Sequence, residues 1–299
     1  MHPATTALVA AVRAADRVSP AVAARLALPL FRRVGAPLPV RPTDRALHEH
    51  AERGTMSVRG RSITTYSWGH GPETVLVVHG WRGRASQFGP IVRELRAAGY
   101  RVVGFDAPAN GESAGRRTDI RDYLGAIDEL QHRHGMFRTV VGHSFGALAA
   151  LIAVHEGTAA GSVVAIAGMA DARFLVDSFA ARVGVGPATA DVLAGRFARR
   201  VLPDVRDVYA RFEAVRHPLP AGVPLLLVHD RADREVPVAE SQRLHAAHGE
   251  RSRLVLTEGA GHSRVLGADA TLDAVTAFTV GGLPAFDRLV AEGVPAASA

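Results

Sequence analysis

Short apolar runs alternate with helical windows along most of this chain, and this alternation limits the fold more than any other feature. The runs are continuous, as expected for strands buried on both faces of a parallel sheet. They cover residues 74–79, 100–105, 139–142, 162–167, 223–229 and 253–257, with helical windows near 85–98, 118–133, 145–156, 238–248 and 267–279. The pattern predicts a doubly wound, mostly parallel α/β sheet.

Three further segments complete the predicted organisation. Residues 56–59 and 62–68 flank Gly60 and read as a hairpin. The connection from 168 to 222 is too long for one crossover helix and has helical apolar content, which predicts a small helical cap. We therefore expect an N-terminal helical extension and linker at 1–55, an α/β core at 56–169 and 218–299, and a cap at 170–217.

The N-terminal extension reads as an amphipathic helical pair broken at Ser19-Pro20 and followed by a proline-rich connector at 37–42. One side of its helical projection is apolar, comprising Leu8, Val12, Val22, Leu26 and Leu30. We expect this stripe to pack on the body of the protein. A membrane-surface or partner-binding role is the alternative that we consider and do not favour.

Charge and composition exclude several classes of function. The net charge of +6 comes from arginine alone, and outside residues 1–55 basic and acidic residues nearly balance without any basic run interleaved with aromatics, so we do not expect nucleic-acid binding. The absence of cysteine rules out disulfides, thiol nucleophiles and iron–sulfur clusters. The longest uncharged stretch, 139–155, is too short and polar to span a membrane, and no basic residue precedes Arg13 as in a secretory signal. A cytoplasmic location is therefore expected.

The most specific chemical signal is Gly142-His143-Ser144-Phe145-Gly146, between a predicted buried strand and a predicted helix. Small residues two positions before and two after a serine allow the tight, strained turn that exposes a nucleophilic hydroxyl at a sheet edge. A plain glycine-rich turn is the structural alternative. In this context the pattern favours Ser144 as a nucleophile.

A serine nucleophile needs a base, and the base needs an acid to orient it. Only His262 lies in a glycine-flanked loop after the last predicted strand, and we interpret His79, His143 and His229 as residues that shape turns or pack at strand ends. Candidate acids also follow predicted strands: Asp230 and Asp233 after one, and Asp171 after the preceding one.

Residues 56–280 resemble the α/β-hydrolase superfamily, and within it bacterial serine esterase-like members. The resemblance rests on five motifs in order: His79-Gly80-Trp81, the loop 106–113, the turn at Ser144, Asp233 before Val236-Pro237, and Gly261-His262. It places the acid at Asp233 and the oxyanion hole at the backbone N–H groups of Trp81 and Phe145. Two departures, Ala109-Asn110 in place of the usual Gly-His and Asp230 in place of a frequent glycine, touch no triad position.

The residues and the resemblance together predict a cofactor-free serine hydrolase, most simply a carboxylesterase acting on a small-molecule ester with a small or medium acyl group. Trp81, Phe174 and Phe179 are the predicted walls of the substrate pocket, and no histidine pair has the spacing and third ligand of a metal site. The same triad also serves thioesterases, amidases, lipases, carbon–carbon hydrolases, acyltransferases and perhydrolases, and the fold alone could serve a ligand-binding or scaffold protein. The sequence does not indicate an oligomeric state.

Overall fold

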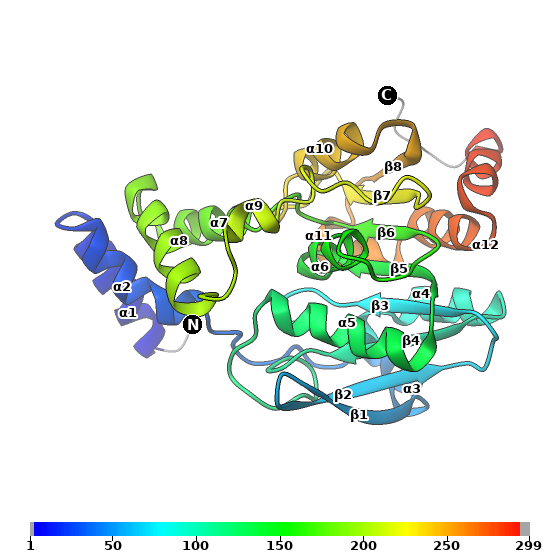
Figure 1. Cartoon of the computed structure of the whole chain (residues 1–299), viewed down its shortest axis with the longest axis horizontal. Helices are drawn as coiled ribbons and strands as arrows, with labels where there is room; N and C mark the ends of the chain where they lie inside the picture. The colour runs from blue at the N-terminus through cyan, green and yellow to red at the C-terminus, as the bar shows by residue number, and fades with distance from the viewer. Residues whose placement is uncertain (1–2, 294–299) are drawn as a thin grey trace. The chain divides into compact units, whose positions relative to one another are not determined.

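The predicted apolar runs form the centre of one eight-stranded sheet in the computed structural model, which describes residues 3–293 (Figure 1). The strands are β1 (Glu52–Val58), β2 (Arg61–Trp68), β3 (Thr74–Val78), β4 (Arg101–Asp106), β5 (Phe137–His143), β6 (Val163–Ile166), β7 (Leu225–Asp230) and β8 (Ser252–Thr257). Their order is β1-β2-β4-β3-β5-β6-β7-β8, and all pairings from β4 to β8 are parallel. The predicted mostly parallel α/β-hydrolase fold is confirmed.

The antiparallel edge of the sheet is the predicted hairpin. Strands β1 and β2 are joined by Arg59 and Gly60, which both have positive φ, and β2 then pairs antiparallel with β4. Left-handed conformations at both central residues match the right-handed twist of the flanking strands. This is why a hairpin forms around Gly60.

Helices cover both faces of the sheet. They are η2 (Ala85–Phe88), α4 (Gly89–Ala97), α5 (Ile120–His134), α6 (Phe145–His155), α10 (Val238–His248), η3 (Gly249–Arg251), α11 (Gly261–Arg264), η4 (Val265–Gly267) and α12 (Asp269–Ala291), with η1 (Pro42–Asp44) and α3 (Arg45–Glu49) before β1. Helices α4 and α12 pack against each other on one face, and α5 packs against α6 on the opposite face (Figure 1). Helix α12 extends well past the predicted window and bends at Gly281 and Gly282.

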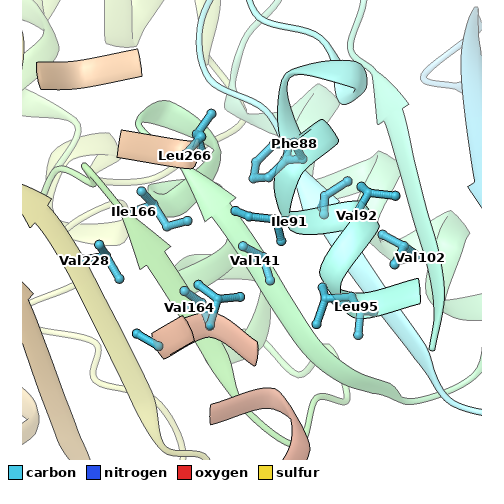
Figure 2. Packing of buried hydrophobic residues seen from close by; sticks show 14 of the residues in the cluster. Phe88, Ile91, Val92, Leu95, Val102, Val141, Val164, Ile166, Val228 and Leu266 are labelled. Atoms are coloured by element: carbon cyan, nitrogen blue, oxygen red, sulfur yellow. The ribbon is translucent and has the colours of Figure 1, made fainter. Parts of the chain in front are cut away.

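The core between α4 and the sheet shows why the strands read as continuous apolar runs. Three side chains of α4 lie over the sheet: Ile91 beside Val141 of β5, Val92 beside Val102 of β4, and Leu95 one turn further on (Figure 2). All five side chains are at most 1% exposed. Since valine and isoleucine pack well on a pleated surface, this layer fixes the central strands under the site described below.

The remaining helices form a second compact unit, made of the chain up to Arg33 and of Asp171–Glu213. It contains α1 (Pro3–Asp16), α2 (Pro20–Phe31), α7 (Arg173–Val183), α8 (Pro187–Val201) and α9 (Val208–Arg211). The predicted break is present because the hydroxyl of Ser19 caps α2 and Pro20 occupies its first turn. The first unit, with the sheet, comprises Val34–Ala170 and the residues from Ala214 onward.

The N-terminal helices, which the sequence predicts to pack on the body of the protein, pack on the helices of the insertion. The carboxylate of Asp16 accepts hydrogen bonds from the N–H of Gly186 (3.1 Å) and the hydroxyl of Thr189 (2.5 Å) at the start of α8. Val12 is fully buried, but Val22, which the projection assigned to the same stripe, is 51% exposed. The unit boundary thus lies at residue 33, and the rest of the segment expected as extension and linker belongs with the sheet.

No helix among the described residues is both long enough and apolar enough to cross a lipid bilayer.

An aromatic contact should carry much of the stability of the helical unit. The ring of Phe31 lies 5.2 Å from the rings of both Phe179 and Phe197, edge to face in each case. Because Phe31 is partly exposed, we expect Phe31→Ala to lower the free energy of unfolding by about 2 kcal/mol, below the usual range for a fully buried phenylalanine. Chemical denaturation would measure this loss. Val18→Ala, at an 87% exposed side chain, is the control, and an equal effect of both substitutions would contradict the assignment.

Candidate active site

Ser144 occupies a strained turn between β5 and α6. Its φ of 55° and ψ of −122° lie outside the regions that non-glycine residues favour, and α6 begins at the next residue. A Cβ on Gly146 would lie 2.1 Å from the carbonyl oxygen of Val78, and one on Gly142 would lie 2.5 Å from the Cα of Ala147. Two glycines are therefore required for the chain to turn back on itself and raise the Ser144 side chain from the sheet edge.

The structure brings Ser144, His262 and Asp233 together, although they lie far apart in the sequence. The Nε2 atom of His262 is 3.0 Å from the Oγ of Ser144, and its Nδ1 is 2.7 Å from Oδ2 of Asp233. Asp233 follows β7 and His262 lies in α11 after β8, so all three residues sit at the carboxyl ends of parallel strands. The hydrogen-bonded order is hydroxyl, imidazole, carboxylate.

The carboxylate of Asp233 is held on both oxygens. Oδ1 accepts the backbone N–H groups of Glu235 at 2.8 Å and Val236 at 3.0 Å, and Oδ2 faces His262. The side chain is completely shielded from solvent. Burial acts to raise the pKa of Asp233, but its hydrogen bonds, above all those with His229 and His262, outweigh burial and hold the pKa well below the ordinary value. Asp233 is therefore an anion at neutral pH.

The two rival acids have other partners. Asp230 is fully buried, and its carboxylate accepts hydrogen bonds from the hydroxyl of Thr257 (2.7 Å) and the N–H of Ala260 (2.9 Å). Those bonds tie the end of β7 to the loop that carries His262. Asp171 belongs to the helical unit, where its Oδ1 accepts the N–H of Phe174 at the start of α7.

Other histidines near Ser144 support the turns. His143 Nε2 donates to the carbonyl oxygen of His262 at 2.8 Å, and burial, reinforced by the neighbouring His262, lowers the pKa of His143 to about 3. His79 accepts the N–H of Ala107 on Nε2 at 2.9 Å. His229, whose position at the end of β7 we interpreted only as packing, contacts Asp233 itself. The signal for it was a polar residue at the end of a buried strand directly before the acid loop.

The loop after β3 passes close to Ser144. A Cβ on Gly80 would lie 3.0 Å from the Cβ of Ser144, so Trp81 immediately follows the point of closest approach. The indole of Trp81 is half-buried and lies edge to face with the ring of Phe145 at 5.7 Å. The N–H of Phe145 is the first of α6, where unpaired amides and the helix dipole favour a negative charge.

The loop 106–113, despite its departure at Ala109-Asn110, has a structural part near the site. The buried carboxylate of Asp106 accepts the N–H groups of Ala85 (2.8 Å) and Glu112 (2.7 Å) and the hydroxyl of Tyr66 (2.9 Å). It thereby joins this loop to the start of η2, which follows the Trp81 loop. Among the residues that the structure describes, no cluster of three or more histidine, aspartate or glutamate side chains could hold a metal ion.

Comparison with known proteins places the chain in a family. Residues 75–275 match the model of the alpha/beta hydrolase family, and the chain belongs to that family. A monoacylglycerol lipase of Mycolicibacterium smegmatis is 26% identical over an alignment of 207 residues, and the match covers 57% of this chain and 73% of the lipase.

Solved structures share the fold at lower sequence identity. An esterase of Pyrococcus furiosus matches with a TM-score of 0.57 and 19% identity, covering 79% of this chain and 92% of the esterase. A monoacylglycerol lipase of Paleococcus ferrophilus matches with a TM-score of 0.56 and 20% identity over 74% of this chain and 99% of the lipase. The mouse alpha/beta hydrolase domain-containing protein 10 matches with a TM-score of 0.58 and 16% identity, covering 81% of this chain and 99% of the mouse protein.

The clearance around Gly146 gives a direct test of the turn. Because a methyl group there would meet the Val78 carbonyl, we expect Gly146→Ala to destabilise the fold by about 1–3 kcal/mol, as overpacking does. Gly222→Ala is the matched control, since a Cβ at Gly222 has no neighbour within 4 Å. Urea denaturation of both variants would measure the difference. Equal stability of the two variants would show that the turn can relax at no cost.

Proposed function

We propose that this chain is a serine hydrolase that cleaves carboxylic esters with small or medium acyl groups. The single observation that carries the proposal is the continuous hydrogen-bonded path from the Ser144 hydroxyl through His262 to the buried carboxylate of Asp233. A hydroxyl is nearly inert at neutral pH unless a positioned base removes its proton. A binding protein would need none of the three groups in this order.

In the proposed first half-reaction, Ser144 Oγ bonds to the ester carbonyl carbon while its proton moves to Nε2 of His262. The carbonyl oxygen becomes an oxyanion, which the backbone N–H groups of Phe145 and Trp81 stabilise. The imidazolium that forms is stabilised by Asp233, whose lowered pKa keeps it charged. Collapse of the tetrahedral intermediate breaks the ester C–O bond, and His262 returns the proton to the departing alcohol.

The second half-reaction releases the acyl group from Ser144. His262, neutral again, removes a proton from a water molecule, and the hydroxide formed attacks the acyl-enzyme carbonyl. Ser144 then leaves with the proton from His262. This step releases the carboxylic acid product and regenerates the free enzyme, and it requires no cofactor.

The substrate pocket is proposed from aromatic side chains. The Trp81 indole, edge to face on Phe145 beside the nucleophile, would line the acyl side. Phe174 and Phe179, the other two walls predicted from the sequence, lie in α7 of the helical unit, and their part in a pocket stays a prediction. Phe179 also packs on Phe31, so the N-terminal helices would support its position.

A glycerol ester is a second candidate substrate within the same chemistry. The observation favouring it is the similarity to the monoacylglycerol lipase of Mycolicibacterium smegmatis. A series of nitrophenyl esters of increasing chain length, assayed beside monoacylglycerols of the same chains, would separate the two. A preference for short nitrophenyl esters supports the carboxylesterase, and a preference for monoacylglycerols supports the lipase.

Replacement of the nucleophile tests the proposal directly. We expect Ser144→Ala to fold normally and to lower kcat on the order of a millionfold, as losses of a triad serine do. A fluorophosphonate probe should label the wild-type protein at Ser144, located by peptide mass spectrometry, and should not label the variant. Labelling at another serine, or unchanged turnover, would contradict the proposal.

The acid side of the pH profile of kcat/KM should reflect the uptake of a single proton. Asp233 and His143 both have lowered pKa values, to about 3 for His143, so neither changes charge between about pH 5 and 8. The base must be neutral to take the Ser144 proton, so if one group controls the acid side, kcat/KM should fall about tenfold per pH unit below its plateau. Steady-state rates from pH 4.5 to 9 would measure this slope. A slope of two would require a second titrating group.

A further inference from the structure

His229 is a buried polar side chain that the proposed mechanism leaves unused. It lies near the end of β7, four residues before Asp233, and neither its side chain nor that of Asp233 is accessible to solvent. Its Nδ1 is 2.7 Å from the hydroxyl oxygen of Ser241 in α10, and its Nε2 is 2.9 Å from the carbonyl oxygen of Val236. The same Nε2 is 3.4 Å from Oδ2 of Asp233.

These contacts determine where His229 carries a hydrogen. The Val236 carbonyl and the Asp233 carboxylate only accept hydrogen bonds, so Nε2 must be the protonated nitrogen. Its N–H donates to the Val236 carbonyl, and the same nitrogen lies within 3.4 Å of Oδ2 of Asp233. Ser241 holds the opposite edge of the ring and prevents it from turning.

We propose that His229 is a positioning residue, which holds Oδ2 of Asp233 in the orientation that receives the Nδ1–H of His262. The role rests on the proposed function, because it acts on the reaction only through Asp233 and His262. The Ser241 hydroxyl, His229, Asp233 and His262 would then form one line of contacts behind the nucleophile.

The carboxylate of Asp233 needs such a partner on Oδ2. Backbone N–H groups of Glu235 and Val236 fix Oδ1 permanently, but the other short contact of Oδ2 is His262, which changes charge in every catalytic cycle. A donor that takes no part in proton transfer keeps Oδ2 in place throughout the cycle. His229 also stabilises the turn after β7, because the N–H of Val236 donates to Oδ1 of Asp233 while its carbonyl oxygen accepts from His229.

Two substitutions separate the donor from the bulk of the ring. His229→Leu removes the N–H while keeping an apolar side chain of similar size, and His229→Gln places an amide N–H where Nε2 stood. We expect the leucine variant to lose about ten- to a hundredfold in kcat with KM nearly unchanged, as for a lost hydrogen bond to a buried charge. The glutamine variant should recover most of that loss, and Ser241→Ala should lose less than the leucine variant.

The matched control is His248→Leu. His248, at the end of α10, is buried like His229. Its ring hydrogen-bonds to the backbone of Leu244 and Leu219, and no hydrogen bond joins it to Ser144, Asp233 or His262. Its substitution should lower stability without changing kcat per folded molecule, with the folded fraction measured by circular dichroism. If the leucine and glutamine variants of His229 lose kcat equally, or if neither loses it, His229 only packs and the proposal is overturned.

A measurement without substrate distinguishes this proposal from the proposed function. Proton nuclear magnetic resonance of the Nδ1–H of His262 reports its hydrogen bond to Asp233. In the full-length protein this resonance should move upfield or broaden in His229→Leu and persist in His229→Gln. An unchanged resonance in the leucine variant overturns the positioning role, whereas a failure of the wild-type protein to hydrolyse esters overturns only the proposed function.

Discussion

The close approach of α6 to the end of β3 is the constraint on which the rest of the site depends. Gly146 contacts the backbone of Val78 and His79 so closely that no side chain fits there. That contact fixes where α6 starts, and with it the strained backbone of Ser144 and the position of the Phe145 N–H at the start of the helix. The Ser144 hydroxyl, the Phe145 N–H and the N-terminal end of α6 are thus positioned by packing within the sheet unit.

Buried carboxylates organise the loops on either side of that turn. Asp106 connects the loop after β4 to the start of η2, and Asp230 connects the end of β7 to the loop after β8. Burial alone would raise the pKa of Asp230, but its bonds from Thr257, Ala260, Gly261 and Ala232 outweigh burial and lower the pKa. An anion that satisfies several N–H groups is an effective anchor, because leaving those donors unpaired would cost more than burying the charge.

Local patterns predicted most of the fold and identified the residues that meet at the candidate site. Valine-rich runs identify the central strands because these strands are buried on both faces of the sheet. The turn at Ser144 can be recognised because all the residues that it requires lie within five consecutive positions. The partner of the N-terminal helices was not predictable in this way, since an apolar stripe shows that a helix packs but not on what. The Asp16 bonds to the start of α8 join residues about 170 positions apart, and no local pattern encodes them. The same holds for the contact of His229 with Asp233, which depends on how the turn after β7 folds back.

Four histidines lie around Asp233 and Ser144, and their hydrogen-bond partners explain why only one suits proton transfer. His79, His143 and His229 each direct a ring N–H at a backbone carbonyl, those of Gly80, His262 and Val236. A carbonyl cannot return a proton, so these three rings keep theirs and serve as fixed donors. His262 instead faces a carboxylate on one nitrogen and a hydroxyl on the other. Because Nδ1 carries its hydrogen toward the carboxylate, Nε2 is the nitrogen whose lone pair faces the Ser144 hydroxyl and can take its proton.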